Sequence, residues 1–324
     1  MKINRFATFA WGLLLYCLFV ILLGVVVRAT GSGAGCGSHW PSCNGELIPS
    51  LEEMKTVIEF THRLTSSAFG LLAIALVVWA FRIYPKEHPV RSAAVLSLIL
   101  TIIEGLIGAI LVRLELVADN ISVARALWMA GHLANTFLLL AAFTLTAWWA
   151  SGGKPLRWRG QGAVIPLLAI GFVAMLLLGM SGAITALGDT LFPVNSLAEG
   201  LQQDFSSSSH FLIQLRIIHP ILAVLSGVYI VWSARKISFL RPNPWTTRFS
   251  QALIGLFILQ MLFGAVNLVL LAPIWMQLVH LLMADLVWMA FILLGAAALA
   301  DDAVHVRSVA SQSSRGSSRT ASTV

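Results

Sequence analysis

The chain has 324 residues, of which 58% are hydrophobic and only 11% charged, and its formal net charge at pH 7 is +7. Soluble domains carry about 25% charged residues, so this composition excludes a soluble enzyme and indicates an integral membrane protein surrounded by the lipid bilayer. In such a protein an excess of lysine and arginine marks the loops that stay in the cytoplasm, so the positive charge does not indicate a nucleic acid partner.

Eight apolar segments are long enough to cross a membrane, which takes about 20 helical residues. The sequence therefore predicts an all-α integral membrane protein with eight transmembrane helices. The first segment is too long for the apolar region of a signal peptide and offers no small-x-small cleavage site, so we expect it to be a true span. The segments lie near residues 9–27, 59–81, 93–112, 126–149, 163–183, 211–233, 249–271 and 275–297.

The basic residues predict how these spans are oriented. With the N-terminus inside, 15 of the 21 lysines and arginines fall on the inner side, and the outer segment from about 184 to 210 has none. Both termini should therefore be cytoplasmic. Residues 301–324 are serine-rich and lack an apolar period, so we expect a disordered cytoplasmic tail there.

Eight spans with both ends inside suggest two pseudo-symmetric four-helix bundles, related by an axis along the membrane normal. Short matches in the same chain order support a duplication. The first span aligns with the fifth when Gly24 is placed on Gly179, and the third aligns with the seventh when Gly108 is placed on Gly264. The expected parts are an N-terminal bundle, a cytoplasmic linker and a C-terminal bundle, at residues 1–150, 151–162 and 163–300.

Four of the eight histidines lie inside predicted spans, one in each even-numbered helix and near its outer end. By half of the chain they form two pairs, His62 with His132 and His219 with His280. Because the even-numbered helices all run in the same direction, the four histidines share about one depth. A histidine in lipid is a functional candidate, although a hydrogen bond to a neighbouring helix is the simpler alternative.

Two imidazoles facing each other across a four-helix bundle suit the axial ligation of a heme iron. Zinc is the competing metal, but it takes three or four ligands, commonly with cysteine or a carboxylate, and the spans offer few of these. Nearby arginines fit a heme, since a guanidinium binds a propionate carboxylate bidentately; the alternative is that they anchor the helices at the interface. The candidate propionate contacts are Arg63, Arg125 and Arg216.

One carboxylate breaks the similarity of the two halves. Glu59 lies three residues before His62 and shares its helix face, whereas Arg216 holds the equivalent position in the second half. An acid beside a bound substrate can move protons or stabilise a cationic intermediate, so we expect the first half to be reactive and the second to hold a cofactor. The alternative is that Glu59 only pairs with Arg63. A second buried acid, Glu104, aligns with Gln260, and its role stays open.

Over nearly the whole chain, apart from the serine-rich tail, the sequence resembles the heme A synthase family. Each matching motif is modest alone, and together they are specific. They are "RATGSGAGCGSHWPSCNG" after the first span, "EFTHRLTSS" in the second, "HLANTFLLL" in the fourth, "RIIHPILAV" in the sixth and "VHLLMADLVW" in the eighth.

The resemblance implies an oxidoreductase of the bacterial cell membrane that converts heme O to heme A for terminal oxidase assembly. A porphyrin methyl group is oxidised to a formyl group, with water as the oxygen source. Carried over to this chain, Glu59 is the essential glutamate, and the C-terminal half carries heme b as a cofactor. The implied heme ligands are His62 and His132 for the substrate heme O, and His219 and His280 for heme b.

The resemblance also bears on the loop after the first span. Cys36 and Cys43 match a cysteine pair of one bacterial branch of the family, which can form a disulfide in the first outer loop. An oxidising outer compartment would preserve such a bridge, as a structural staple or with a redox role. Two residues depart from the family pattern, His39 in this loop and Glu104, where a glutamine is expected. Cys17, inside the first span, is expected to be a small apolar residue.

The partners that follow are heme O, a heme O synthase, a quinone or other electron acceptor, and a second copy of the chain. Two other functions fit the four histidines. One is a diheme membrane cytochrome b that passes electrons between quinone and a partner. The other is a heme-binding chaperone or transporter without turnover.

Overall fold

The computed structural model describes residues 4–300 of the chain, and the predicted tail at 301–324 lies outside the described residues. Within the described part, eight helical segments are long and apolar enough to span a membrane. The predicted all-α membrane fold is confirmed. The segments are α1 (Arg5–Ala29), α2 (Met54–Ile83), α3 (Pro89–Arg113), α4 (Val123–Ala150), α5 (Val164–Leu191), the continuous stretch α7 (Phe211–Gln214), η1 (Leu215–Ile217) and α8 (Ile218–Leu240), α9 (Pro244–Val269), and α10 (Ile274–Leu299).

The helices begin where local chemistry favours it. The side chain of Asn4 accepts a hydrogen bond from the backbone N–H of Ala7, at 2.7 Å, and so caps α1. Ser122 caps α4 in the same way. Proline occupies the first position of α3 and of α9. A backbone N–H at that position makes no hydrogen bond within the helix, so its absence in proline costs nothing there.

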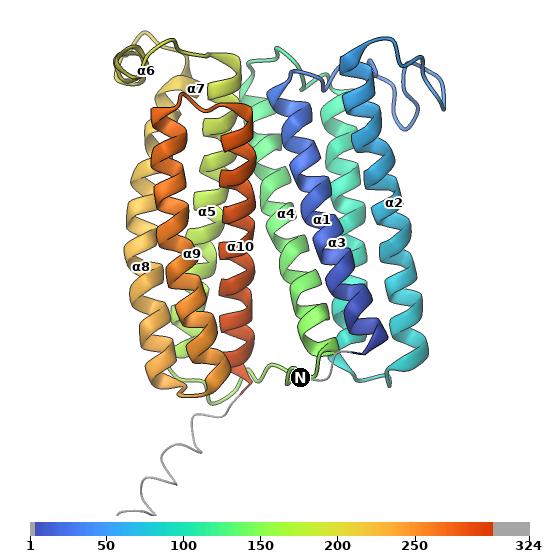
Figure 1. The fold of residues 1–324 in the computed structure, drawn as a ribbon, viewed down its shortest axis with the longest axis vertical. Coiled ribbons are helices and arrows are strands. Elements are labelled where there is room, and N and C mark those ends of the chain that lie inside the picture. Colours follow the sequence, from blue (N-terminus) through green and yellow to red (C-terminus); the bar gives the residue numbers. More distant parts are fainter. Residues whose placement is uncertain (1–3, 301–324) are drawn as a thin grey trace, which may run out of the picture.

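The spans form two groups of four helices that lie side by side (Figure 1). One group contains α1 to α4, and the other contains α5, α8, α9 and α10. The groups meet where α4 packs against α5 and α10, and where α1 packs against α10. At this junction the indole of Trp288 on α10 stacks on the ring of Phe137 on α4, with 5.0 Å between ring centres. The central helices α4 and α10 therefore join the two groups.

The loops divide between the two ends of the bundle (Figure 1). The loop after α1, which carries both loop cysteines, lies at the same end as the short helix α6 (Leu197–Asp204). We call this the disulfide end, and the end where α1 begins we call the terminal end. Because α2, α4, α8 and α10 all begin at the disulfide end, their histidines lie towards it, as the sequence predicted.

The structure differs from the predicted spans in one boundary and in the regularity of one helix. Helix α5 continues to Leu191, so Asp189 is helical and does not belong to an outer loop. The sixth span is not one regular helix, since a 3₁₀ turn at Leu215–Ile217 precedes α8. Pro220 has no N–H to donate to the carbonyl of Arg216, four residues earlier, which favours the irregular turn around Arg216.

Candidate functional site

The histidine pair of the C-terminal half has the spacing of two axial ligands. The rings of His219 and His280 lie with their centres 6.4 Å apart. Metal–imidazole bonds are about 2 Å long, so two such bonds in line, with half a ring behind each nitrogen, separate ring centres by roughly 6 Å. The side chain of Ser181 lies 3.0 Å from Nδ1 of His219, which leaves Nε2 of that ring for a metal. The spacing of the rings therefore fits a heme iron between them, and ligation through Nε2 of His280 would replace the contact of that nitrogen with Nε2 of Gln260, at 3.3 Å.

Two glycines on neighbouring helices leave space for the rings of His219 and His280. A Cβ added at Gly182 would lie 3.0 Å from Cε1 of His219, and one added at Gly264 would lie 3.0 Å from Cε1 of His280. Such distances are tighter than ordinary carbon contacts, so any larger residue would push the ring away. The backbones of α5 and α9 can thus approach the histidines only because these two positions are glycine.

The histidine pair of the N-terminal half is built differently. Nδ1 of His132 lies 3.3 Å from a carboxylate oxygen of Glu104, a charge contact without hydrogen-bond alignment. Glu104 also accepts hydrogen bonds from Nδ2 of Asn135, at 2.5 Å, and from the hydroxyl of Thr136. Nδ1 of His62 has no hydrogen-bond partner among the described residues. This half therefore places an acid against one histidine and leaves the other ring without a polar partner at Nδ1.

The proposed repeat alignment holds in one place and fails in another. Nε2 of Gln260 lies 3.3 Å from Nε2 of His280, whereas Glu104 lies 3.3 Å from Nδ1 of His132. Aligning these two positions therefore matches the residues in contact, although not the ring nitrogens. The placement of Gly24 on Gly179 does not match residues with the same contacts. A Cβ at Gly24 would lie 3.3 Å from the ring of His62, and the glycine with this role on α5 is Gly182, three residues further on. Gly179 instead faces Phe137 of α4, at the junction of the two groups.

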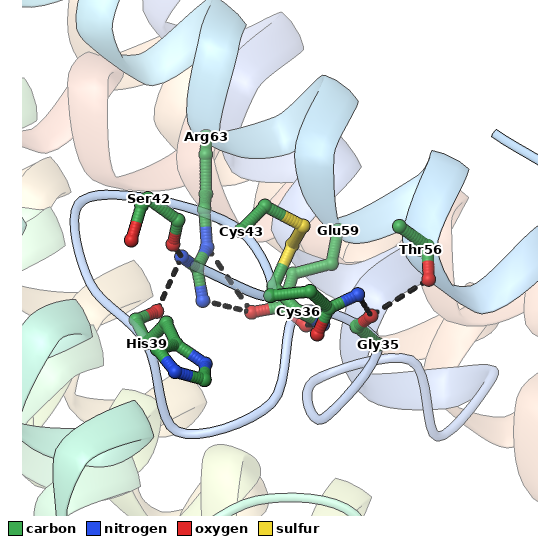
Figure 2. The surroundings of a disulfide bond; sticks show 9 residues. Gly35, Cys36, His39, Ser42, Cys43, Thr56, Glu59 and Arg63 are labelled. Atoms are coloured by element: carbon green, nitrogen blue, oxygen red, sulfur yellow. Dashed lines mark hydrogen bonds and ion pairs between the residues drawn. A yellow bond between two sulfur atoms is a disulfide. The ribbon is translucent and has the colours of Figure 1, made fainter. Parts of the chain in front are cut away.

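The disulfide loop rests on Glu59 (Figure 2). Cys36 and Cys43 form the predicted disulfide, and both are buried. The backbone N–H of Cys36 donates to one carboxylate oxygen of Glu59, at 2.9 Å. The other oxygen forms an ion pair with Nη2 of Arg63, at 2.6 Å, and Nη1 of the same guanidinium donates to the backbone oxygens of His39 and Ser42. Glu59, which is 3% exposed, thus connects the loop to α2.

A second contact fixes the start of this loop. The hydroxyl of Thr56 donates to the backbone oxygen of Gly35, at 2.7 Å. A Cβ at Gly35 would lie 2.7 Å from the backbone nitrogen of Thr56 and would overlap the backbone of Lys55. The loop therefore lies directly on the first turn of α2, within three residues of Glu59.

The three arginines predicted to contact propionates all have partners within the protein. Besides Arg63, Nη1 of Arg125 donates to the backbone oxygens of Ala118 and Asn120. Arg216 forms ion pairs with Asp189, at 3.3 Å, and with Asp204, at 3.0 Å. Burial raises the pKa of Asp204, an effect that the charge of Arg216 opposes. The charge of Arg216 is therefore largely balanced by two carboxylates.

Sequence reasoning missed two charged residues. Arg28 reaches from α1 across to α5 and α10, and nothing in its local sequence indicates a contact so distant along the chain. Asp285 is wholly buried in α10, and neither carboxylate oxygen has a hydrogen-bond partner among the described residues. An aspartate within an apolar span is itself a signal of function, and it could have been found by the same rule that found the histidines.

Within residues 4–300, no three side chains of histidine, cysteine, aspartate or glutamate gather as a metal-binding group.

Comparison with known proteins agrees with the motifs. Over 303 residues, 94% of this chain, it is 52% identical to proteins named protoheme IX farnesyltransferase from two strains of Thermus thermophilus, and it spans 50% of their length. It is 42% identical over 92 residues, 28% of the chain and 30% of the relative, to heme A synthase of Bacillus cereus. A family model, COX15-CtaA, described as cytochrome oxidase assembly protein, matches residues 7–292. The chain therefore belongs to the COX15-CtaA family of cytochrome oxidase assembly proteins, which confirms its resemblance to the heme A synthases.

Proposed function

We propose that this protein is a heme A synthase, which oxidises a methyl group of heme O to the formyl group of heme A. Water supplies the oxygen, so each formyl group formed releases four electrons and four protons. The observation that carries the proposal is the position of Glu59, a buried carboxylate beside His62 and beneath the disulfide loop, in a chain of this family.

The N-terminal half is the proposed substrate side. His62 and His132 flank or ligate heme O, and Glu59 accepts protons from the reacting carbon or stabilises positive charge that develops there. The disulfide loop and α2 hold Glu59 in place through Cys36 and Arg63. A carboxylate in a water-poor site acts more strongly on a developing charge than one in bulk water.

The C-terminal half is the proposed cofactor side. His219 and His280, whose rings already have the spacing of axial ligands, would hold heme b. When bound, heme b supplies one-electron transfer from the substrate side towards a quinone or another acceptor. We keep Arg63, Arg125 and Arg216 as proposed propionate contacts. Arg125 supports this, since its buried Nε has no hydrogen-bond partner among the described residues.

We further propose that the protein lies in the bacterial plasma membrane, with both termini cytoplasmic and the disulfide end outside, as the distribution of basic residues favours. Its proposed partner is a heme O synthase. The Thermus relatives bear the name of a farnesyltransferase acting on protoheme IX, and this chain spans half of their length. We assign the transferase to the other half of those proteins, which would join the supply of the substrate to its oxidation.

The test is co-expression with a source of heme O, followed by chromatography of the extracted pigments. We expect heme A from the wild-type chain. Glu59→Gln should leave heme bound but lower the yield of oxidised product by about 100-fold or more, since a positioned acid or base contributes that much to a rate. The matched control is Glu53→Gln, because Glu53 is exposed at the start of the same helix and its side chain caps nothing.

Each other outcome identifies another function. Heme B as the sole pigment of the wild type would favour a diheme cytochrome b. Bound heme O without oxidised product, under every acceptor tried, would favour a heme chaperone or transporter. A normal yield of heme A from Glu59→Gln would remove Glu59 from the mechanism and leave the family assignment intact.

A further inference from the structure

An arginine of the N-terminal half reaches into the C-terminal half. Arg28 lies in the last turn of α1, partly buried, and its guanidinium extends away from its own bundle. Nη1 donates to the backbone oxygen of Ala186 and to the hydroxyl of Thr190, both at 2.6 Å, and Nη2 donates to Oε1 of Gln277, at 2.6 Å. Gln277 is fixed in turn, because its Nε2 donates to the backbone oxygen of Ala272. The cation is therefore held between α1, α5 and α10.

Its anchors stand in register with the C-terminal histidine pair. Ala186 lies four residues after Gly182, the residue that packs against His219, and Gln277 lies three residues before His280. One helical turn is about 3.6 residues, or about 5.4 Å along the axis. Helix α5 runs towards the disulfide end and α10 runs away from it, so both offsets lead the same way (Figure 1). The guanidinium is thus anchored about one turn from the histidine pair, towards the disulfide end.

The charge of Arg28 lacks the compensation that Arg216 has. Its three hydrogen bonds within the described residues all go to neutral oxygens. Asp189 is close enough to act on Arg28 electrostatically, but it accepts a hydrogen bond from Arg216, which Asp204 also contacts. Three of the five N–H groups of Arg28 are used in these bonds, which leaves two for another acceptor. A cation within a membrane protein is costly until an anion joins it.

We propose that Arg28 binds a propionate carboxylate of the heme held by His219 and His280. The N-terminal half thus contributes a binding residue to the cofactor of the C-terminal half. This inference rests on the proposed function, since it requires heme at that histidine pair. A positive charge beside the heme favours the reduced iron, which carries one positive charge fewer than the oxidised iron, so Arg28 should raise the reduction potential.

The experiment is a spectroelectrochemical titration of the purified, heme-loaded protein. Arg28→Gln should lower the midpoint potential of the heme with two histidine ligands, and Arg28→Lys, which keeps the charge, should stay close to the wild type. Arg113→Gln is the matched control. It removes the same charge at the same end, from the exposed end of α3, where Arg113 donates a hydrogen bond to the backbone oxygen of Trp40. That control should leave the potential unchanged.

A second variant keeps the test decisive if Arg28→Gln does not assemble. Gln277→Glu places a carboxylate against Arg28, where it competes with a propionate, and should also lower the potential. A purely structural link between the halves predicts the opposite pattern, a lower melting temperature with the potential unchanged.

The outcomes distinguish the assignment of Arg28 from the proposed heme site on which it rests. An intact bis-imidazole spectrum with unchanged potentials in Arg28→Gln and Gln277→Glu overturns the assignment of Arg28 alone. If the wild type shows no bis-imidazole spectrum, the proposed heme site is wrong, and the assignment of Arg28 is wrong with it.

Discussion

Three of the four intramembrane histidines owe their position to a missing side chain on the span that precedes their own. In each case a glycine on the preceding span lets the backbone approach the imidazole ring, and a Cβ there would come within 3.0–3.3 Å of the ring. The fourth histidine, His132, meets the carboxylate of Glu104. The glycines are Gly24, Gly182 and Gly264.

Alanine at Gly264 is expected to displace the ring of His280. The added methyl group would sit 3.0 Å from Cε1 of that ring, and such overpacking costs about 1–3 kcal/mol. Gly108 is the matched control, since the repeat alignment places it on Gly264 and a Cβ there meets nothing within 4 Å. Thermal unfolding in detergent should show a loss for Gly264→Ala and no loss for Gly108→Ala. Equal melting temperatures would remove the glycine contact as a constraint on His280.

The sequence alone could predict the candidate histidines, but it could not predict the residues that position them. A histidine in an apolar span is rare and costly, so its presence alone indicates function. A glycine in such a span has many uses, and Gly179 and Gly182 cannot be told apart without the structure. Arg28 was missed because its partners lie more than 150 positions further along the chain.

At the scale of elements, the loop after α1 and the first turns of α2 form one unit. The loop contributes the disulfide and the N–H of Cys36, and the helix contributes Glu59 and Arg63, which bind the loop from below. The sequence predicted the elements and the cysteine pair. It did not predict that the carboxylate would support the loop, because that contact depends on how closely two backbones approach at Gly35.

Gly35→Ala should therefore disturb Glu59 from outside the helix. Its Cβ would collide with the backbone of α2 at Lys55 and Thr56, and backbone cannot move aside as a side chain can. We expect the loop to lift, the bond from Cys36 to Glu59 to lengthen, and the yield of oxidised heme to fall. The control is Gly33→Ala, since the nearest atoms to a Cβ there belong to side chains and not to backbone, namely those of Val117, at 3.2 Å, and Val27, at 3.9 Å.

Two measurements check this prediction. Pigment chromatography reports the yield, and alkylation after mild reduction reports whether the buried cysteines have become accessible. A Gly35→Ala protein with the wild-type yield and protected cysteines would show that the loop does not position Glu59.

At the scale of the whole molecule, the two groups of helices are joined by a shared apolar core. In the most apolar stretch of α4 and of α10, 56% of residues are buried inside the protein, against 11–33% in the other spans. The other spans are also apolar but keep a larger share of their residues on the outside of the protein, which suits contact with lipid. Hydropathy alone cannot separate these two cases, which is why the sequence predicted eight spans but not which of them lie at the centre.

Trp288 links the two groups of helices directly at this junction. It is fully buried, stacks on Phe137 and donates its indole N–H to the backbone oxygen of that residue, at 2.6 Å. Removing a buried tryptophan costs about 3–5 kcal/mol, so Trp288→Ala should sharply lower stability in denaturant titrations followed by circular dichroism. Trp232 on α8 is 54% exposed and provides the control, with an expected change within about 0.5 kcal/mol.

Because α10 also carries His280, loss of Trp288 should weaken heme retention in parallel with the fold. Equal stability of the two variants would mean that the halves are held together elsewhere, with Arg28 as the next candidate.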